Sequence, residues 1–318
     1  MNPLELFREY WGDAGTLASL GEGHINQTWK VEAADGVWVL QQINRHVFRD
    51  PGRVMGNLQQ VLAHVRSVPL PELRTTRTGA NHVVVNDEWF RVWRFVEGGV
   101  VKKQPASLGE AEVAASAFGG FIAALRDLPG TLLPTIQGFH SLDYFYRRYK
   151  TLHISSQYDE FITRCLDRSI LFRMGMGPIH GDCKFQNVLL SEDGSKVLAI
   201  LDLDTLMQGH WGFDWGDLVR SAFVAQGAPE KDMYLALLRG FAPHIKLSNE
   251  EVFIYAPAYV ACTLGVRYLI DHHEGDPWFR VETHGDNLIR AERQFRFAAA
   301  CEASASEIRR WVESEMKR

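Results

Sequence analysis

The sequence predicts an α+β protein with two lobes, a small strand-rich lobe over residues 1–97 and a larger, mainly helical lobe over residues 98–318. Turn dipeptides between short alternating apolar segments dominate the first lobe, whereas apolar stripes at helical spacing dominate the second. Strands that precede helices, without regular alternation of the two, are typical of an α+β fold. The glycine pair Gly98-Gly99 marks the expected boundary between the lobes.

The first lobe is predicted to contain two helices and two hairpins. The helices cover residues 3–11 and 51–66, and the hairpins pair residues 28–33 with 37–43 and 82–85 with 89–96. Asp35-Gly36 and Asn86-Asp87 supply the two turns, because these residue types tolerate the backbone angles of tight hairpins. Residues 94–99 then lead into the helical lobe.

The second lobe is predicted to be a set of helices interrupted by one hairpin. A helix capped by Ser107 and Glu110 opens it. The expected helices are 107–125, 142–151, 158–170, 229–240, 248–271, 287–300 and 304–317.

Composition narrows the class of protein. The chain has 318 residues, 46% hydrophobic and 23% charged, which describes a globular protein of one or two domains. A net charge of −5 argues against a nucleic-acid partner. Four widely spaced cysteines without a C-x-x-C pair indicate free thiols in a reducing compartment. The N-terminus does not look like a signal peptide and no segment is expected to span a membrane, so we expect a cytoplasmic protein with no membrane partner.

The stretch from Pro178 to Ser221 contains the strongest functional signal. Strands are expected at 188–190 and 196–203, joined by a turn at 191–195, so that Asn187 and Asp202 meet at one end of a hairpin. Asp182 lies on the loop that feeds this end. One aspartate can orient and deprotonate a hydroxyl, while an Asn–Asp pair can hold Mg²⁺ on nucleotide phosphates. The spacing D-x-x-x-x-N followed by an aspartate at a strand end matches the catalytic loop of kinases.

This stretch resembles the aminoglycoside phosphotransferase / choline kinase superfamily, whose members share the protein-kinase-like fold. The resemblance implies ATP as a co-substrate, Mg²⁺ as the cofactor, and Lys184 as a cation that neutralises the transferring γ-phosphoryl group. His180 is expected to brace the loop. Asp214 and Asp217 are expected to cap a helix or to brace the loop, and Asp204 is either a second metal ligand or structural. The tripeptide H-G-D recurs at 284–286, where Asp286 is interpreted as a helix N-cap.

The nucleotide is expected to contact three parts of the first lobe. The loop containing Gly21 and Gly23 could cover its phosphates. The motif alone is better explained by a plain hairpin loop, but its position just ahead of a hairpin in the first lobe favours the phosphate role. Backbone groups of Arg94 and Val96 would read the adenine edge. Gln41 stands where kinases usually carry a lysine, and a contact with Gln59 or Gln60 could preserve the geometry without the charge. This departure fits either a subgroup that grips ATP differently or a protein that has lost catalysis.

Further segments resemble the N-acetylhexosamine 1-kinase subgroup, which phosphorylates the anomeric hydroxyl of GlcNAc or GalNAc. They are GEGHIN (21–26), VLQQINRHVFRDP (39–51), ILDLDTLMQG (200–209), VRYLIDHHEGDPWF (266–279) and HGDNLIRAERQF (284–295). The resemblance implies a sugar site formed by His24, Asp182, Arg267 and Trp278. Simpler roles remain open: a salt bridge to Asp271 for Arg267, packing for Trp278, and a surface position for His24. Ser221 replaces a large apolar residue of the subgroup, a change that could widen the pocket.

The sequence therefore predicts an ATP- and Mg²⁺-dependent kinase for a sugar hydroxyl, most simply the anomeric hydroxyl of an N-acetylhexosamine. A kinase of the same superfamily for choline, homoserine, an aminoglycoside or another sugar is the first alternative, and a nucleotide-binding protein without catalysis is the second. A metallohydrolase is a third alternative, but no metal-binding motif in the sequence supports it. Its ligands would come from His180, Asp182, His210, Asp214, His272 and His273.

Overall fold

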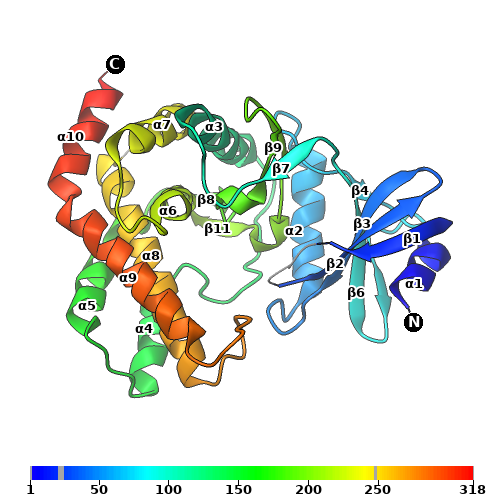
Figure 1. Ribbon diagram of the computed structural model, residues 1–318, viewed down its shortest axis with the longest axis horizontal. Helices are drawn as coiled ribbons and strands as arrows, with labels where there is room; N and C mark the ends of the chain where they lie inside the picture. Colours follow the sequence, from blue (N-terminus) through cyan, green and yellow to red (C-terminus); the bar gives the residue numbers. More distant parts are fainter. Residues whose placement is uncertain (1, 21–24, 247–248, 318) are drawn as a thin grey trace.

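The computed structural model describes residues 2–20, 25–246 and 249–317, and the chain forms two lobes (Figure 1). The N-terminal lobe is built around an antiparallel sheet, and the C-terminal lobe is mainly helical, as the sequence predicts. Residues 95–98 connect β6 (Glu88–Arg94) of the N-terminal lobe to β7 (Gly99–Val101) of the C-terminal lobe.

The N-lobe sheet has six strands in the order β1-β2-β3-β6-β4, with β5 paired to β6. The strands are β1 (Ala14–Ser19), β2 (Gln27–Ala33), β3 (Gly36–Ile43), β4 (Leu73–Arg74), β5 (Val83–Val85) and β6 (Glu88–Arg94). Both predicted hairpins are present. Asn86 and Asp87 have φ angles of 51° and 65°, the left-handed values that a tight two-residue hairpin turn requires. The pattern of β1 is weak and β4 is very short, and neither strand is predicted.

Two helices cover the opposite faces of this sheet. Helix α1 (Pro3–Tyr10), capped by Asn2, packs Leu6 and Phe7 into a small core with strands β2 and β3. Helix α2 (Pro51–His64) lies between the sheet and the C-lobe (Figure 1) and belongs to the large core that continues through the C-lobe. The buried Asn57 amide of α2 donates to two C-lobe carbonyls, at 2.7 Å to Leu133 and 2.8 Å to Leu206. The large core therefore extends across both lobes, while the small core under α1 belongs to the N-lobe alone.

The C-lobe packs its helices around two short sheets. The helices are α3 (Leu108–Leu125), α4 (Leu142–Thr151), α5 (Asp159–Asp167), α6 (Trp211–Phe223), α7 (Lys231–Phe241), α8 (Glu250–His273), α9 (Asp286–Ala303) and α10 (Ala305–Met316). One sheet has the order β10 (Val197–Ile200), β9 (Val188–Ser191), β7 (Gly99–Val101), and the other pairs β11 (Met207–His210) with β8 (Met176–Ile179). Single 3-10 turns cover Arg168–Phe172, Phe185–Asn187, Leu203–Thr205 and Ala242–His244.

Two helices of the C-lobe are unusually long and apolar. Helices α3 and α8 are long and apolar enough to cross a membrane by those two criteria alone. In the folded chain, 72% of the most apolar window of α8 and 44% of that of α3 are buried. Their apolar faces instead form the C-lobe core, where Phe118 and Phe121 of α3 and Phe253 of α8 are buried.

Candidate active site

The β9–β10 hairpin brings the predicted catalytic residues together. Val188 pairs with Ile200, and the Leu201 N–H donates to the Asn187 carbonyl at 2.8 Å, so Asn187 and Asp202 lie at the same end. The second strand ends at Ile200, three residues before the predicted end. Asp202 then adopts a left-handed conformation (φ 57°, ψ 59°), which an aspartate tolerates better than most residues.

Asp182 lies at the centre of this cluster. The Lys184 ammonium contacts its Oδ2 atom at 2.6 Å. The Asn187 amide donates both to Oδ2 (2.9 Å) and to the Asp182 carbonyl (2.8 Å). Burial alone would raise the pKa of Asp182, but the Lys184 charge and these hydrogen bonds outweigh it and lower that pKa below its usual range. Asp182 is therefore ionised and well oriented, but intrinsically a weak base.

Asp214, at the start of α6, holds the loop that carries Asp182. The carboxylate of Asp214 accepts the backbone N–H groups of His180 (2.9 Å) and Gly181 (2.8 Å). Gly181 has φ 87°, and an added Cβ would stand 2.5 Å from the Thr205 carbonyl oxygen. The predicted bracing role of Asp214 is thus confirmed, and glycine is required at the tightest point of the loop.

Two buried histidines support the same loop. His180 accepts the Asp182 N–H at Nδ1 (3.2 Å), and its Nε2 therefore carries the proton and donates to the Leu201 carbonyl at 3.0 Å. His140 Nε2 donates to the Gly181 carbonyl at 2.8 Å. Burial lowers the pKa of each imidazole to about 4, so both are neutral at pH 7. His180 braces the loop as expected, whereas the role of His140 has no signal in the sequence.

Asp202 lies close to a second aspartate, Asp204. Burial, together with the negative charge of Asp204, raises the pKa of Asp202 to about 7, although Lys184 opposes the shift. Asp204 is fully buried and forms an ion pair with Arg91 of β6 (Nη2 to Oδ1, 2.5 Å), and it also accepts from the Asn26 amide at 2.7 Å. Asp204 therefore joins the two lobes.

Gln41, which stands where kinases usually carry a lysine, contacts a buried arginine. Its Oε1 atom accepts from Arg91 Nε (3.1 Å) and from the Trp93 indole (2.7 Å). Arg91 stands directly opposite Gln41 in the β3–β6 register. The predicted contact with Gln59 or Gln60 is not made, since Gln60 bonds its own helix and Gln59 contacts Asn81. The buried cation at this position is Arg91, which sequence reasoning missed and which the cross-strand register could have revealed.

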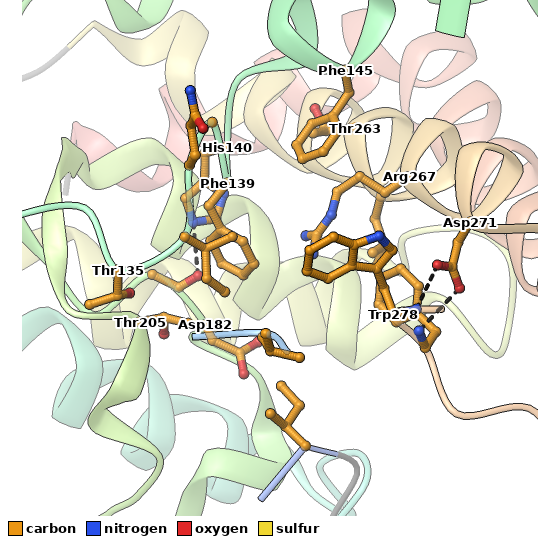
Figure 2. Close-up of a pocket in the computed structure, with 18 of the residues that line it drawn as sticks. Thr135, Phe139, His140, Phe145, Asp182, Thr205, Thr263, Arg267, Asp271 and Trp278 are labelled. Carbon is orange, nitrogen blue, oxygen red and sulfur yellow. Dashed lines mark hydrogen bonds between the residues drawn. The ribbon is translucent and has the colours of Figure 1, made fainter. Parts of the chain in front are cut away.

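A cavity of about 840 Å³ opens in front of Asp182 (Figure 2). Asp182, Lys184 and Asp202 line its inner end. Its walls include the aromatic residues Phe139, Tyr144, Phe145, Tyr268, Trp278 and Phe279. The lining contains eight cationic side chains and five aspartates: Arg49, Arg53, Arg148, Lys184, Arg220, Arg267, Arg280 and Arg290 against Asp50, Asp182, Asp202, Asp217 and Asp271.

Arg267 and Trp278 both line this cavity (Figure 2). The guanidinium of Arg267 lies 4.5 Å from the Phe139 ring centroid and 5.4 Å from that of Phe279. Asp271 does not pair with it, because its carboxylate accepts the N–H groups of Trp278 (2.8 Å) and Phe279 (3.0 Å) instead. Burial lowers the pKa of Arg267. Within the described part of the chain no hydrogen bond or carboxylate holds this cation, so it is available to a ligand.

The other predicted residues are placed as follows. Gly21, Gly23 and His24 lie outside the described residues. The Arg94 N–H already donates to the Glu72 carbonyl at 2.7 Å, and neither Arg94 nor Val96 lines the cavity.

Two smaller expectations are wrong. Ser221 does not line the cavity, since its buried hydroxyl accepts the Phe185 N–H at 3.2 Å and donates to Leu218. Asp286 is the first residue of α9 instead of its N-cap, and its carboxylate accepts the N–H groups of Glu282 and Thr283.

The metallohydrolase ligand set is not assembled. The ring nitrogens of His180 bond the backbone, Asp214 binds two N–H groups, and His210 Nδ1 accepts the Gly212 N–H at 2.9 Å. Over residues 2–20, 25–246 and 249–317, metal-ligand spacing is found for one different group, His272, Asp276 and His284.

The fold and the site together define a class. A small β-sheet lobe, a helical lobe, and an H-G-D-x-x-x-x-N loop facing an aspartate at a hairpin end make the chain a phosphotransferase of the protein-kinase-like fold. The chain belongs to the phosphotransferase enzyme family, whose family model matches residues 16–245. The superfamily and the enzyme class predicted from the sequence, a phosphotransferase with an alcohol group as acceptor, are confirmed.

Solved structures with the same fold include several antibiotic kinases. Amicoumacin kinase, in complex with AMP-PNP and Ca²⁺, has a TM-score of 0.67 at 10% identity, over 94% of each chain. Spectinomycin phosphotransferase, in complex with ADP and spectinomycin, has a TM-score of 0.62 at 11% identity, over 94% of this chain and 97% of that one. An aminoglycoside phosphotransferase from Alicyclobacillus acidocaldarius has a TM-score of 0.62 at 13% identity, over 93% and 92%. At these identities the likeness establishes the fold alone.

Proposed function

We propose that the protein is an ATP- and Mg²⁺-dependent kinase for the anomeric hydroxyl of an N-acetylhexosamine, GlcNAc or GalNAc. The observation that supports this acceptor best is the cavity, which is cationic, has aromatic walls and ends at Asp182. The reaction is proposed to take place in the cytoplasm, which agrees with four free cysteines.

The charge of the cavity distinguishes between acceptor classes. A polyamine antibiotic or choline would call for acidic walls, whereas cationic side chains exceed aspartates here. A neutral sugar needs hydrogen-bond donors for its oxygens and an apolar surface for its ring face. The unpaired Arg267 provides donors, and Trp278 provides an aromatic surface. His24, the third proposed sugar contact, rests on the family resemblance alone.

The donor set beside Asp182 suits a divalent cation. Asn187 offers an amide oxygen, and Asp202 offers a carboxylate whose pKa is raised by desolvation and by the negative charge of Asp204. Carboxylate and amide oxygens are hard ligands of the kind that Mg²⁺ prefers. We propose that these two residues would hold Mg²⁺, which would neutralise phosphate charge when bound. The nucleotide is further proposed to contact the loop at Gly21 and Gly23, and the lobe containing Gln41, Arg94 and Val96.

Asp182 and Lys184 are proposed to have different roles in phosphoryl transfer. In the free enzyme the ammonium of Lys184 holds Asp182 ionised and lowers its basicity. A γ-phosphoryl group would compete with Asp182 for that ammonium, and any loosening of the 2.6 Å contact makes Asp182 a stronger base. Since phosphoryl transfer needs orientation more than early deprotonation, Asp182 would chiefly align the acceptor hydroxyl and take its proton late.

The test is an ADP-release assay with ATP and Mg²⁺ against GlcNAc, GalNAc, glucose, choline, homoserine and an aminoglycoside. Turnover with the N-acetylhexosamines, and loss of the product's reducing end, would support phosphorylation at the anomeric position. Turnover only with another acceptor would replace this proposal by the broader family alternative. ATP binding without turnover on any acceptor would favour a protein that has lost catalysis.

Asp182→Asn tests the assignment of the catalytic residue. It should abolish turnover, because the amide cannot accept the proton, while ATP binding measured by calorimetry stays within a few-fold. Asp193→Asn is the matched control, since Asp193 only caps the exposed hairpin turn, with hydrogen bonds to Ser191 and Ser195. Turnover of Asp182→Asn at the rate of the control would refute the assignment.

A further inference from the structure

We propose that His272, Asp276 and His284 form a zinc-binding site at the base of the segment that joins α8 to α9. His272 lies in the last turn of α8, Asp276 begins the connecting segment and His284 ends it. None of these residues lines the cavity in front of Asp182. The site is therefore separate from the proposed phosphoryl-transfer centre.

The spacing of the donor atoms suits a small tetrahedral cation. His284 Nδ1 stands 3.3 Å from Asp276 Oδ2, and His272 Nδ1 stands 3.9 Å from Asp276 Oδ1. One ligand atom from each residue lies within 4.8 Å of the other two. Two ligands of a tetrahedral zinc ion stand about 3.3 Å apart. Two imidazoles and one carboxylate are zinc ligands that leave the fourth position to water.

One of the three ligand atoms makes no hydrogen bond with the described residues. The Nδ1 atom of His272 is buried and has no hydrogen-bond partner among the described residues. A buried ring nitrogen without a partner is unfavourable, and a metal ion between it and Asp276 would satisfy it. The two rings lie stacked, with centroids 4.5 Å apart, so one must turn to converge on a metal. The His284 side chain is 75% exposed and has room to do so.

The carboxylate of this cluster is held in place by a second layer of contacts. The buried Asn287 amide donates to Asp276 Oδ1 at 2.8 Å and to Asp271 Oδ2 at 2.9 Å. Metal-binding carboxylates are commonly oriented by hydrogen bonds of this kind. Asp271 in turn accepts the N–H groups of Trp278 and Phe279, as the dashed lines in Figure 2 show.

Zinc at this position would therefore join the two ends of the segment that carries the aromatic wall of the cavity. By linking His272 to His284 it would restrict residues 273–283, among them Trp278 and Phe279. The proposed role is structural: the ion holds the wall and takes no part in phosphoryl transfer. The competing explanation is an ion pair of His284 with Asp276 that needs no metal.

The test uses the full-length chain, freed of metal with EDTA and titrated with ZnCl₂ in a calorimeter without nucleotide or acceptor. We expect one equivalent of zinc to bind the wild type and His273→Ala, and His284→Ala to lose this binding. His284 and His273 are both exposed, so neither substitution should disturb folding, and His273 lies outside the cluster. Absence of zinc binding to the wild type, or equal binding by His284→Ala, would overturn the site.

Hydrogen exchange gives a second readout. Zinc should slow amide exchange over residues 273–285 in the wild type and in His273→Ala, but not in His284→Ala. Zinc bound without protection of this segment would also overturn the proposal, because the ion would then lie elsewhere. Neither measurement needs kinase activity, so the zinc site stands or falls independently of the proposed reaction.

Discussion

Replacing Arg91 by methionine tests the ion pair that joins the two lobes. Methionine keeps much of the side-chain volume but leaves the carboxylate of Asp204 fully buried, with the Asn26 amide as its remaining hydrogen-bond partner among the described residues. Removing one member of a buried ion pair typically costs about 3–5 kcal/mol. The unpaired carboxylate can avoid being buried as a charge by binding a proton. For an ordinary aspartate this protonation costs about 4 kcal/mol at pH 7 and about 2 kcal/mol at pH 5.5.

The destabilisation should therefore depend on pH with a definite sign. In the variant the folded state carries one proton more than the unfolded state, so its stability relative to the wild type falls as the pH rises from 5.5 to 7. Urea denaturation at both pH values measures the difference. We expect the free energy of unfolding to fall by about 4 kcal/mol at pH 7 and by about half as much at pH 5.5.

A neighbouring arginine provides the control. Arg94 lies on the same strand but is exposed and stacks on the Trp38 ring, so Arg94→Met should cost under about 1 kcal/mol at either pH. The double variant Arg91→Met/Asp204→Leu should regain much of the lost stability, because it leaves no buried charge. A loss for Arg91→Met that is below about 1 kcal/mol, or that does not change with pH, would refute this account of the ion pair.

Three further predictions concern the site. Since the pKa of Asp202 is raised to about 7, Mg²⁺ must displace a proton from this residue below that pH. The affinity for Mg²⁺, measured by calorimetry, should rise up to about tenfold per pH unit from pH 6 to 7 and level off by pH 8. An affinity that does not change with pH would contradict the assignment of Asp202 as a metal ligand. Gly181→Ala should lower the free energy of unfolding by about 1–3 kcal/mol and reduce turnover, because its Cβ would meet the Thr205 carbonyl; an unchanged urea midpoint would show that the loop can relax. Arg267→Met should raise KM for the acceptor about 10–100-fold while KM for ATP stays the same, and equal effects on both substrates would rule out a specific role in acceptor binding.

Local signals in the sequence were sufficient for the catalytic hairpin. The order of loop, strand, turn and strand depends on neighbouring residues, and the pairing of β9 with β10 follows from them. The N-lobe hairpins follow from their turn residues in the same way. Strands β7, β8 and β11 are short and are not predicted, because they are stabilised by pairing with segments far away in the chain, β7 with β9 and β8 with β11.

The charged network was predictable only in part. Asp182, Asn187 and Asp202 stand out because they share one motif. Arg91 does not, because an arginine on a strand is ordinarily exposed, and its burial depends on Asp204 in the other lobe. Arg267 likewise has no carboxylate partner because Asp271, one helical turn away, accepts backbone N–H groups instead of pairing with the guanidinium. Such competition between partners is decided by tertiary geometry.

The position of α2 has a consequence for dissecting the molecule. Its apolar face, with Val54, Leu58 and Val61, is part of the large core that runs through the C-lobe, and Asn57 fills two C-lobe carbonyl acceptors. A fragment starting at Gly98 would leave these carbonyls and the matching apolar surface open to water. The visible two-lobe outline is therefore a poor guide for truncation: residues 98–318 expressed alone should aggregate, and thermal unfolding of the whole chain should occur as a single calorimetric transition.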